Sequence, residues 1–326
     1  MPRLLSKLSL ATAALSLAVT AATAADQWVL PSAYPPSNYH VENLTQFAEE
    51  VTKASNGELT ITVHPNASLF KAPDIKRAVQ TGQAQAGEVL ISLHENENPL
   101  FGIDVVPFLA TSLDQSKKLW EASREQIGEA LAKQGVTLLY STPWPAQGIF
   151  VKKELTSVED LRGTKWRAYN AGTSRIAQLV GAQPVTVQSA DLPQALATGT
   201  IDALMTSSAT GVDSKIWESL DRYYDTQAWI PRNVVFVNTA SFEALEPAVQ
   251  EAVKTAARAA ETRGWELAAE KTKAYTDQMT QNGMQVVTPS ATLKDGLAKV
   301  GDQLLQDWLG KAGDAGKSVV DAYRAM

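Results

Sequence analysis

The stretch Leu161-Arg162-Gly163-Thr164-Lys165-Trp166-Arg167-Ala168-Tyr169-Asn170 places an arginine where a short strand passes into a helix. Residues 164–169 alternate as a strand does, and cap-type side chains follow before a helical pattern that Gly181 ends. A guanidinium at the end of a strand, beside the free N–H groups of a helix start, favours an anion, and its planar fork fits a carboxylate. Arg167 is therefore the first candidate for ligand binding; an interdomain salt bridge is the alternative.

Strand and helix patterns alternate along most of the chain, which predicts α/β layers with mostly parallel strands. The strand patterns are residues 28–32, 59–64, 86–91, 136–141, 148–152, 165–169, 184–188, 203–206 and 234–238. The main helical patterns between them are residues 43–54, 75–81, 113–134 and 192–198.

An internal similarity suggests two related lobes. Residues 74–82 and 191–199 share Asp, Ala, Thr and Gly at equal spacing. Each copy predicts an Asp cap, two helical turns and a Gly stop before a strand. Because short helices of this kind are common, chance similarity remains the alternative.

A long helical pattern from Pro247 to Gln281 is interrupted only by Gly264. At about 1.5 Å per residue it would reach roughly 50 Å, enough to lie across two lobes. A surface helix kinked at Gly264 is the alternative. The cluster Pro143-Trp144-Pro145 predicts the point where the chain crosses from one lobe to the other.

The amino terminus predicts a secretory signal over residues 1–25. Arg3 and Lys7 precede an apolar run, and small residues place the cleavage near Ala24 and Ala25. No later segment has the unbroken apolar length that spans a bilayer, so we expect an exported chain without stable membrane insertion. Residues 1–24 carry two basic and no acidic residues, so cleavage changes the formal net charge from −6 to −8.

Composition and motifs exclude several functions. The chain has no cysteine, which removes disulfides, thiol catalysis and thiolate metal sites. Its acidic balance disfavours nucleic acid as a partner. Nucleotide-binding glycine motifs and hydrolase signatures are missing, and none of the three histidines has a second His at metal-ligand spacing. We therefore expect no metal, no cofactor and no catalytic residue.

Several motifs together carry a resemblance over nearly all of the mature chain. They are the segment 34–40 with the helix after it, Val79-Gln80-Thr81-Gly82, Pro107-Phe108-Leu109, Leu161-Arg162-Gly163 with Arg167, and Leu196-Ala197-Thr198-Gly199-Thr200-Ile201-Asp202. The chain resembles the extracytoplasmic solute receptors of tripartite ATP-independent periplasmic (TRAP) transporters, the DctP-like family.

The resemblance implies a type II-like, two-lobed periplasmic binding protein fold, with crossover strands and a long helix spanning both lobes. On this basis we expect lobe I to comprise residues 26–145 and 232–271, and lobe II residues 146–231 and 272–326. It also implies that the lobes close around one organic acid and that an arginine of lobe II, here Arg167, clamps the carboxylate.

Further candidates follow from the resemblance. Sialic-acid-binding members carry a second arginine where this chain has Gln147, which puts a ligand of that kind in doubt. They carry an asparagine after the strand that ends here in Thr206 and Ser207, whose hydroxyls could still bond a ligand. The turn before the next crossover strand offers Trp229, Arg232 and Asn233, each with packing or a hinge role as the alternative.

Rings near these positions suggest the kind of acid. Tyr34, Tyr169 and Trp229 are placed to flank a planar ligand, whereas strand alternation turns Trp166 away from Arg167 into the core. We therefore predict an aromatic monocarboxylate such as a benzoate or hydroxybenzoate. Aliphatic hydroxy or keto acids, dicarboxylates and sugar acids remain alternatives.

Two polar residues complete the predicted site. Asn170 stands at the helix start beside Arg167. Glu88, on the strand pattern 86–91, could accept a hydrogen bond from a ligand hydroxyl; a solvated or salt-bridged glutamate is its alternative.

The predicted function is that of a monomeric periplasmic receptor that closes on a small carboxylate and delivers it to the membrane permease subunits of a TRAP transporter. An exported lyase or hydrolase and a ligand sensor for a membrane kinase are the alternatives from other classes. Detection of an altered product would favour the enzyme, and a neighbouring kinase gene would favour the sensor.

Overall fold

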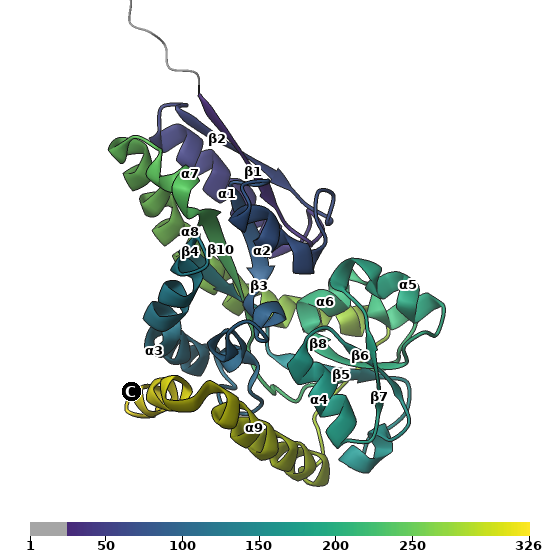
Figure 1. Ribbon diagram of the computed structural model, residues 1–326. Coiled ribbons are helices and arrows are strands. Elements are labelled where there is room, and N and C mark those ends of the chain that lie inside the picture. Colours follow the sequence, from purple (N-terminus) through teal and green to yellow (C-terminus); the bar gives the residue numbers. More distant parts are fainter. Residues whose placement is uncertain (1–24) are drawn as a thin grey trace, which may run out of the picture.

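The computed structural model describes residues 25–326, and the predicted signal segment lies almost entirely outside them. The described chain forms two α/β lobes joined side by side (Figure 1). This arrangement confirms the predicted fold class. None of the helices within residues 25–326 combines the length and apolar character needed to cross a bilayer.

Lobe I contains the first four strands and one late strand. β1 and β2 pair in parallel, and β10 lies between β3 and β4, antiparallel to both. β1 also lies beside β3, which extends the layer. The strands are β1 (Asp26–Pro31), β2 (Leu59–His64), β3 (Ala86–Leu90), β4 (Val136–Pro143) and β10 (Arg232–Asn238).

Lobe II contains one six-stranded sheet in the order β11-β9-β5-β8-β6-β7. The strands are β5 (Gln147–Val151), β6 (Lys165–Ala168), β7 (Gln183–Thr186), β8 (Ala203–Ser207), β9 (Arg222–Tyr224) and β11 (Gln285–Val287). The three-residue strands β9 and β11 at one side of this sheet are absent from the sequence-based prediction.

The prediction of mostly parallel strands is wrong for the two crossover strands. β5 runs antiparallel to β8 and β9, and β10 runs antiparallel to β3 and β4. Both strands enter their sheet directly from the other lobe, without the helical connection that makes successive strands parallel. The remaining pairings, β1 with β2, β6 with β7 and β8, and β11 with β9, are parallel.

The two crossover segments form the hinge between the lobes. The first follows β4 at Trp144, as the breaker cluster predicts, and the second precedes β10. They are bonded to each other: Trp144 N–H donates to Pro231 O at 2.8 Å, and Gln147 N–H donates to Trp229 O at 2.9 Å. Backbone hydrogen bonds therefore hold the two crossover segments together where the lobes meet.

Helices cover the sheets of both lobes. They are α1 (Tyr39–Ala54), α2 (Ala72–Gln80), α3 (Leu113–Ala132), α4 (Ala171–Leu179), α5 (Leu192–Ala197), α6 (Ser208–Asp213), α7 (Thr239–Glu243), α8 (Pro247–Gln281) and α9 (Ala291–Arg324). The 3-10 helices are η1 (Ile91–His94), η2 (Pro99–Val105), η3 (Val158–Leu161), η4 (Ser189–Asp191) and η5 (Ile216–Glu218).

The long helix α8 is continuous and has the predicted bounds. It packs on α1 and β4 in lobe I and on α6 in lobe II, so it spans both lobes. Gly264 is no kink. A Cβ added there would lie 2.6 Å from Thr142 Oγ1, so the glycine allows the helix to approach β4 closely.

The C-terminal helix α9 was not predicted. It packs on α4 and η3 in lobe II and on α3 and η2 in lobe I, so a second helix also bridges the lobes (Figure 1). Gly313 interrupts it with φ 57° and ψ −144°. The residue boundaries proposed for the two lobes therefore remain a prediction.

The two similar Asp-to-Gly segments form α2 and α5, and both end before a glycine with positive φ, Gly82 at 72° and Gly199 at 66°. The predicted Asp cap of the first copy is wrong, because α2 begins one turn earlier, after Lys71, and Asp74 lies in its first turn. Asp191 does occupy the cap position of α5, but its side chain makes no capping hydrogen bond.

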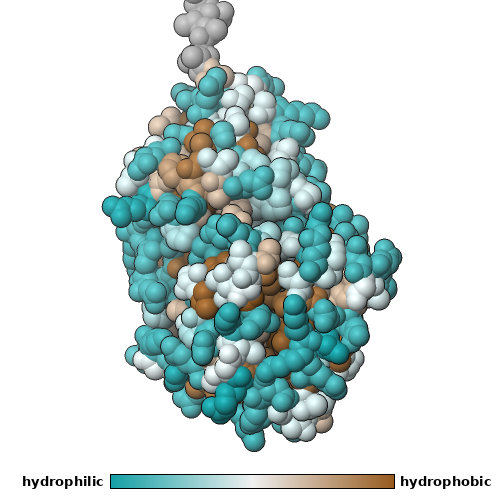
Figure 2. Space-filling view, turned by 90° about the vertical axis from the view of Figure 1, so that its right-hand side faces the viewer, coloured by the Kyte–Doolittle hydropathy of each residue, from teal (hydrophilic) through white to brown (hydrophobic). Residues whose placement is uncertain are grey.

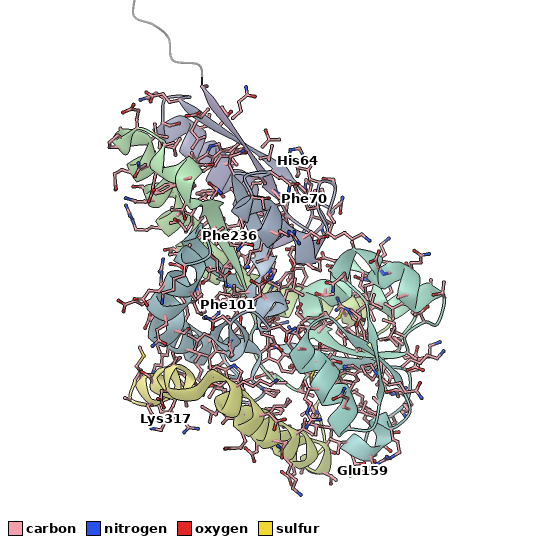
Figure 3. The ribbon with its side chains drawn as sticks, in the orientation of Figure 1. His64, Phe70, Phe101, Glu159, Phe236 and Lys317 are labelled. Carbon is pink, nitrogen blue, oxygen red and sulfur yellow. The ribbon has the colours of Figure 1, made fainter. Side chains whose placement is uncertain are left out.

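Apolar side chains fill the layers of both lobes. Phe101 and Phe236 lie fully buried inside lobe I, whereas Glu159 of lobe II and Lys317 of α9 are exposed (Figure 3). The face in Figure 2 is largely hydrophilic, and hydrophobic residues show in patches between the polar ones. One buried hydrophobic cluster also joins the lobes, because it contains Tyr34 and Leu90 of lobe I together with Trp166 of lobe II.

Candidate functional site

A small cavity lies between the lobes beside the hinge, with a volume of about 40 Å³. Lobe I, lobe II and both crossover segments contribute to its wall. The lining residues are Tyr34, Ala72, Leu90, Leu93, Trp144, Gln147, Arg167, Tyr169, Gln188, Ser189, Thr206, Ser207, Thr210 and Pro231. Six of the eleven candidate residues from the sequence line this cavity.

Arg167 reaches the cavity from β6 and is only 3% exposed. Its Nε donates to Val187 O at 2.9 Å, and its guanidinium carbon lies 5.0 Å from the centre of the Tyr169 ring. Burial lowers the pKa of Arg167 to about 10, with only tyrosines acting against that effect, so it remains a cation at neutral pH. A buried cation that has no carboxylate neighbour among residues 25–326 is suited to an anionic ligand.

The local sequence explains how Arg167 is directed. Trp166, its neighbour on β6, is fully buried in the core of lobe II, because successive strand side chains point to opposite faces. The helix α4 begins directly after Asn170, whose side chain accepts from Thr173 N–H at 2.8 Å. The strand, cap and helix therefore follow the order expected from the sequence.

Tyr169 and Gln147 are fixed by the protein itself. The Tyr169 hydroxyl donates to Gln147 Oε1 at 3.2 Å, and Gln147 Nε2 donates to Pro145 O at 3.1 Å. Burial raises the pKa of Tyr169, so its hydroxyl stays neutral. Both residues line the cavity, and both are held in position by the first crossover segment.

Hydroxyl groups line the lobe II side of the cavity at the end of β8. Thr206 and Ser207 both face it, and Ser207 Oγ also accepts from Thr210 N–H at 3.2 Å as the cap of α6. On the lobe I side the wall is formed by the Tyr34 ring, with Trp144 packed edge-on at 4.8 Å between ring centres. The cavity therefore combines a cation, hydroxyls and aromatic rings.

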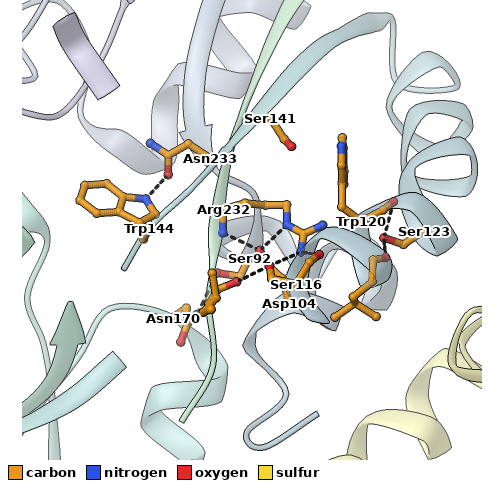
Figure 4. A network of polar contacts seen from close by, with 12 residues as sticks. Ser92, Asp104, Ser116, Trp120, Ser123, Ser141, Trp144, Asn170, Arg232 and Asn233 are labelled. Atoms are coloured by element: carbon orange, nitrogen blue, oxygen red, sulfur yellow. Dashed lines mark hydrogen bonds and ion pairs between the residues drawn. The ribbon is translucent and has the colours of Figure 1, made fainter. Parts of the chain in front are cut away.

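Asn170 does not line the cavity. Its Nδ2 donates to Ser92 Oγ at 2.9 Å, so it joins α4 of lobe II to η1 of lobe I (Figure 4). The same amide caps α4, because its oxygen accepts from Thr173 N–H.

Arg232 does not line the cavity. It lies fully buried inside lobe I, near Asp104, Ser116 and Trp120 (Figure 4). Its backbone N–H donates to Asp104 Oδ2 at 2.8 Å, and Nη2 donates to Ser116 Oγ at 3.1 Å. The guanidinium also lies 5.0 Å from the centre of the Trp120 ring. Arg232 thus has packing and ionic partners within lobe I, which the sequence separates from it by more than 100 residues.

Glu88, Asn233 and Trp229 are likewise not among the residues that line the cavity. Asn233 accepts from Trp144 Nε1 at 2.8 Å (Figure 4). It also donates to Glu88 Oε1 at 2.9 Å, so it joins the wall residue Trp144 to Glu88. Trp229 is 1% exposed and contributes its backbone carbonyl to the hinge. Its ring packs in the same hydrophobic cluster as Tyr34 and Tyr169, although it is not one of the residues that line the cavity.

Sequence reasoning missed several wall residues, notably Trp144, Gln188, Ser189 and Thr210. Trp144 belongs to the cluster Pro143-Trp144-Pro145, which predicts the crossover between the lobes. Its place in that cluster could have indicated that its side chain lies near the ligand site. Gln188 and Ser189 follow β7 at the same sheet edge as the end of β6, which a parallel pairing of β6 and β7 would have indicated.

A larger groove, about 570 Å³, opens between η2, α4 and α9. Of its two basic residues, Arg175 and Lys311, Arg175 is 44% exposed and paired with Asp307 at 3.3 Å. We place the candidate ligand site at the smaller cavity, because Arg167 is buried there without an acidic partner. Within residues 25–326 no cluster of three or more metal-ligating side chains occurs.

The comparisons with known proteins agree with this architecture. The profile of the family described as bacterial extracellular solute-binding protein, family 7 (DctP), matches residues 32–311. This chain belongs to that family. Its members are extracytoplasmic receptors of TRAP transporters, which bind small organic acids and deliver them to a membrane permease. The family is one of periplasmic transport receptors rather than enzymes.

Three solved receptors are particularly similar. DctP6 of Bordetella pertussis, a receptor binding pyroglutamic acid, is 53% identical, with a TM-score of 0.91 over 92% of this chain and 100% of that one. DctP7 of the same organism, also binding pyroglutamic acid, is 47% identical, with a TM-score of 0.91 over 92% and 100%. A marine metagenome receptor specific for pyroglutamate is 42% identical, with a TM-score of 0.91 over 93% and 99%.

Curated relatives are more distant. A solute-binding protein of Albidiferax ferrireducens is 28% identical over 53% of this chain and 51% of its own length, so the match spans about half of that protein.

Proposed function

We propose that this protein is the TRAP receptor for pyroglutamate or a closely similar compact cyclic monocarboxylate. The observation that carries the proposal is the similarity, at 42–53% identity over nearly the full chain, to three receptors described as binding pyroglutamate. This replaces the aromatic acid that the sequence suggested, since none of these three receptors is described as binding one.

The cavity supports a ligand of this size and charge. A single enclosed water needs about 10–15 Å³ of such space and occupies roughly 30 Å³ in the liquid, so a cavity of about 40 Å³ corresponds to about three waters, or roughly 90 Å³. That space suits one small ring. The proposed contacts are Arg167 for the carboxylate, Thr206 and Ser207 for polar ring atoms, and Tyr34, Tyr169 and Gln147 around them.

An aromatic monocarboxylate is the second candidate. The rings of Tyr34, Trp144 and Tyr169 line the cavity, and they would stack on a flat ligand as well as pack against a five-membered ring. The lactam of pyroglutamate differs from a benzoate by offering an N–H donor and a carbonyl acceptor, which the hydroxyls at the end of β8 can satisfy.

Calorimetric titration of the purified mature chain tests the proposal. Pyroglutamate should bind, with benzoate, 4-hydroxybenzoate, succinate and glucuronate at least tenfold weaker. Tighter binding of a benzoate would establish the second candidate instead. Incubation with each acid followed by mass spectrometry would reveal an altered product if the protein were an enzyme, and a kinase gene beside the receptor gene would favour the sensor.

A further inference from the structure

Glu88 of β3 lies in the interior directly behind the lobe I wall of the cavity, at 2% exposure. Its Oε2 accepts from Ser32 Oγ at 2.6 Å and its Oε1 accepts from Asn233 Nδ2 at 2.9 Å. The carboxylate is therefore held in one place and has no basic Lys or Arg partner among residues 25–326.

Within residues 25–326, the ionisable side chain paired with Glu88 is His40, and it does not cancel this charge. His40 Nδ1 lies 3.2 Å from Glu88 Oε1, and the His40 ring stacks on Trp144 with 4.1 Å between centres. Burial lowers the pKa of His40, so the imidazole is neutral at neutral pH. A net negative charge thus remains behind the wall.

Hydrogen bonds through Asn233 connect Glu88 to residues that line the cavity. Asn233, which donates to Glu88, accepts hydrogen bonds from Trp144 Nε1 at 2.8 Å and from the Tyr34 hydroxyl at 3.5 Å, and both rings line the cavity. Leu90, another wall residue, is two positions from Glu88 on the same face of β3, a rise of about 7 Å. The pKa of Tyr34 responds to both charges, since Glu88 raises it and Arg167 lowers it.

We propose that Glu88 is a specificity-determining residue whose buried charge excludes dianionic acids, so that the site accepts one carboxylate and no second one. This inference deepens the proposed function and rests on it. Arg167 neutralises the first carboxylate on the lobe II side. A second carboxylate, at the far end of the ligand, would lie against the lobe I wall and meet the field of Glu88 in a site with little water.

The expected effect is large enough to measure. Two like charges separated by about 10 Å in surroundings of effective dielectric about 20 repel each other enough to change an affinity about tenfold. Uncharged polar ends, such as the lactam of pyroglutamate, do not meet this repulsion. Charge rather than size would therefore distinguish ligands of equal length.

The test compares glutarate with its monomethyl ester at pH 7.5, by calorimetric titration. The two have the same carbon chain up to the ester methyl, but only glutarate carries a second charge. For the unchanged protein the monoester should bind at least tenfold tighter than glutarate. In Glu88→Gln, which keeps the shape and one of the two acceptor oxygens that Ser32 and Asn233 use, this ratio should fall at least fivefold.

Glu251→Gln is the matched control, because it removes the same charge from an exposed position on α8, and its ratio should equal that of the unchanged protein. Equal affinity of both ligands for the unchanged protein would overturn the inference even if Glu88→Gln failed to fold. So would an unaltered ratio in folded Glu88→Gln. Failure of pyroglutamate to bind to the unchanged protein would overturn the proposed function instead, and this inference with it.

Discussion

Replacement of Arg167 by alanine should separate ligand binding from folding. Among residues 25–326 this guanidinium has one hydrogen bond, from Nε to Val187 O, and it lies over the face of the Tyr169 ring. Losing them costs about 1 kcal/mol for the hydrogen bond and about 1–2 kcal/mol for the ring contact. Removing a buried charge offsets part of that cost. The unliganded chain should therefore lose no more than about 2 kcal/mol of stability.

Binding should suffer much more. A ligand carboxylate that reaches this depth without its cation is left buried and unpaired, which costs roughly 2–5 kcal/mol. This corresponds to about 30-fold to several thousandfold in Kd. Arg167→Lys should give an intermediate loss, because an ammonium keeps the charge but cannot present the planar fork.

The assay is calorimetric titration with pyroglutamate, together with thermal unfolding with and without the ligand. Lys165→Ala provides the control, since Lys165 is an exposed cation on the same strand. It should bind like the unchanged protein and keep the ligand-induced rise in Tm. An Arg167→Ala variant that remains folded and binds with unchanged Kd would refute the carboxylate role of Arg167.

Three further changes probe the frame of the site. Gly264→Ala should destabilise the protein by about 1–3 kcal/mol in denaturant unfolding, since the new Cβ would lie 2.6 Å from Thr142 Oγ1; an unchanged midpoint would mean that α8 shifts freely. Asp104→Asn should cost about 3–5 kcal/mol, because it leaves the Arg232 cation buried, and a loss near zero would argue against this pair. Burial raises the pKa of Glu95 from 4.5 to about 7. The folded state then holds the proton more tightly, so this contribution to stability is present below pH 4.5 and is lost as the pH rises through 7. Glu95→Gln should accordingly raise Tm at pH 8 and leave it nearly unchanged at pH 4, and equal shifts at both pH values would contradict this.

Local patterns predicted the parts of the fold that local forces determine. The bounds of α8, the strand β2 and the glycine ends of α2 and α5 all follow from periodicity and backbone preference. The short strands β9 and β11 were missed because three residues are too few to show the alternation of apolar and polar side chains that marks a strand. The antiparallel direction of β5 and β10 depends on chain crossing between lobes, which no window of sequence contains.

The same distinction applies to the site. Arg167 was found because a strand, a cap and a helix start occur within ten residues. Arg232 looked equivalent, at the start of a strand near a turn, but Asp104, Ser116 and Trp120 surround it from distant parts of the chain. Glu88 was placed near the ligand by its strand position, whereas Ser32 and Asn233 hold it behind the wall.

We predict that a ligand closes the lobes, because the cavity wall is divided between them. Arg167 and the hydroxyls of Thr206 and Ser207 belong to lobe II, whereas Tyr34 and Leu90 belong to lobe I. A ligand changes the balance between open and closed forms only by the contacts that it makes in one and not in the other. A carboxylate bound to Arg167 alone has the same contacts in both forms, so acetate should bind without closing the lobes. The body of the acid must reach the lobe I wall, and the field of Glu88 at that wall then decides which acids can complete closure.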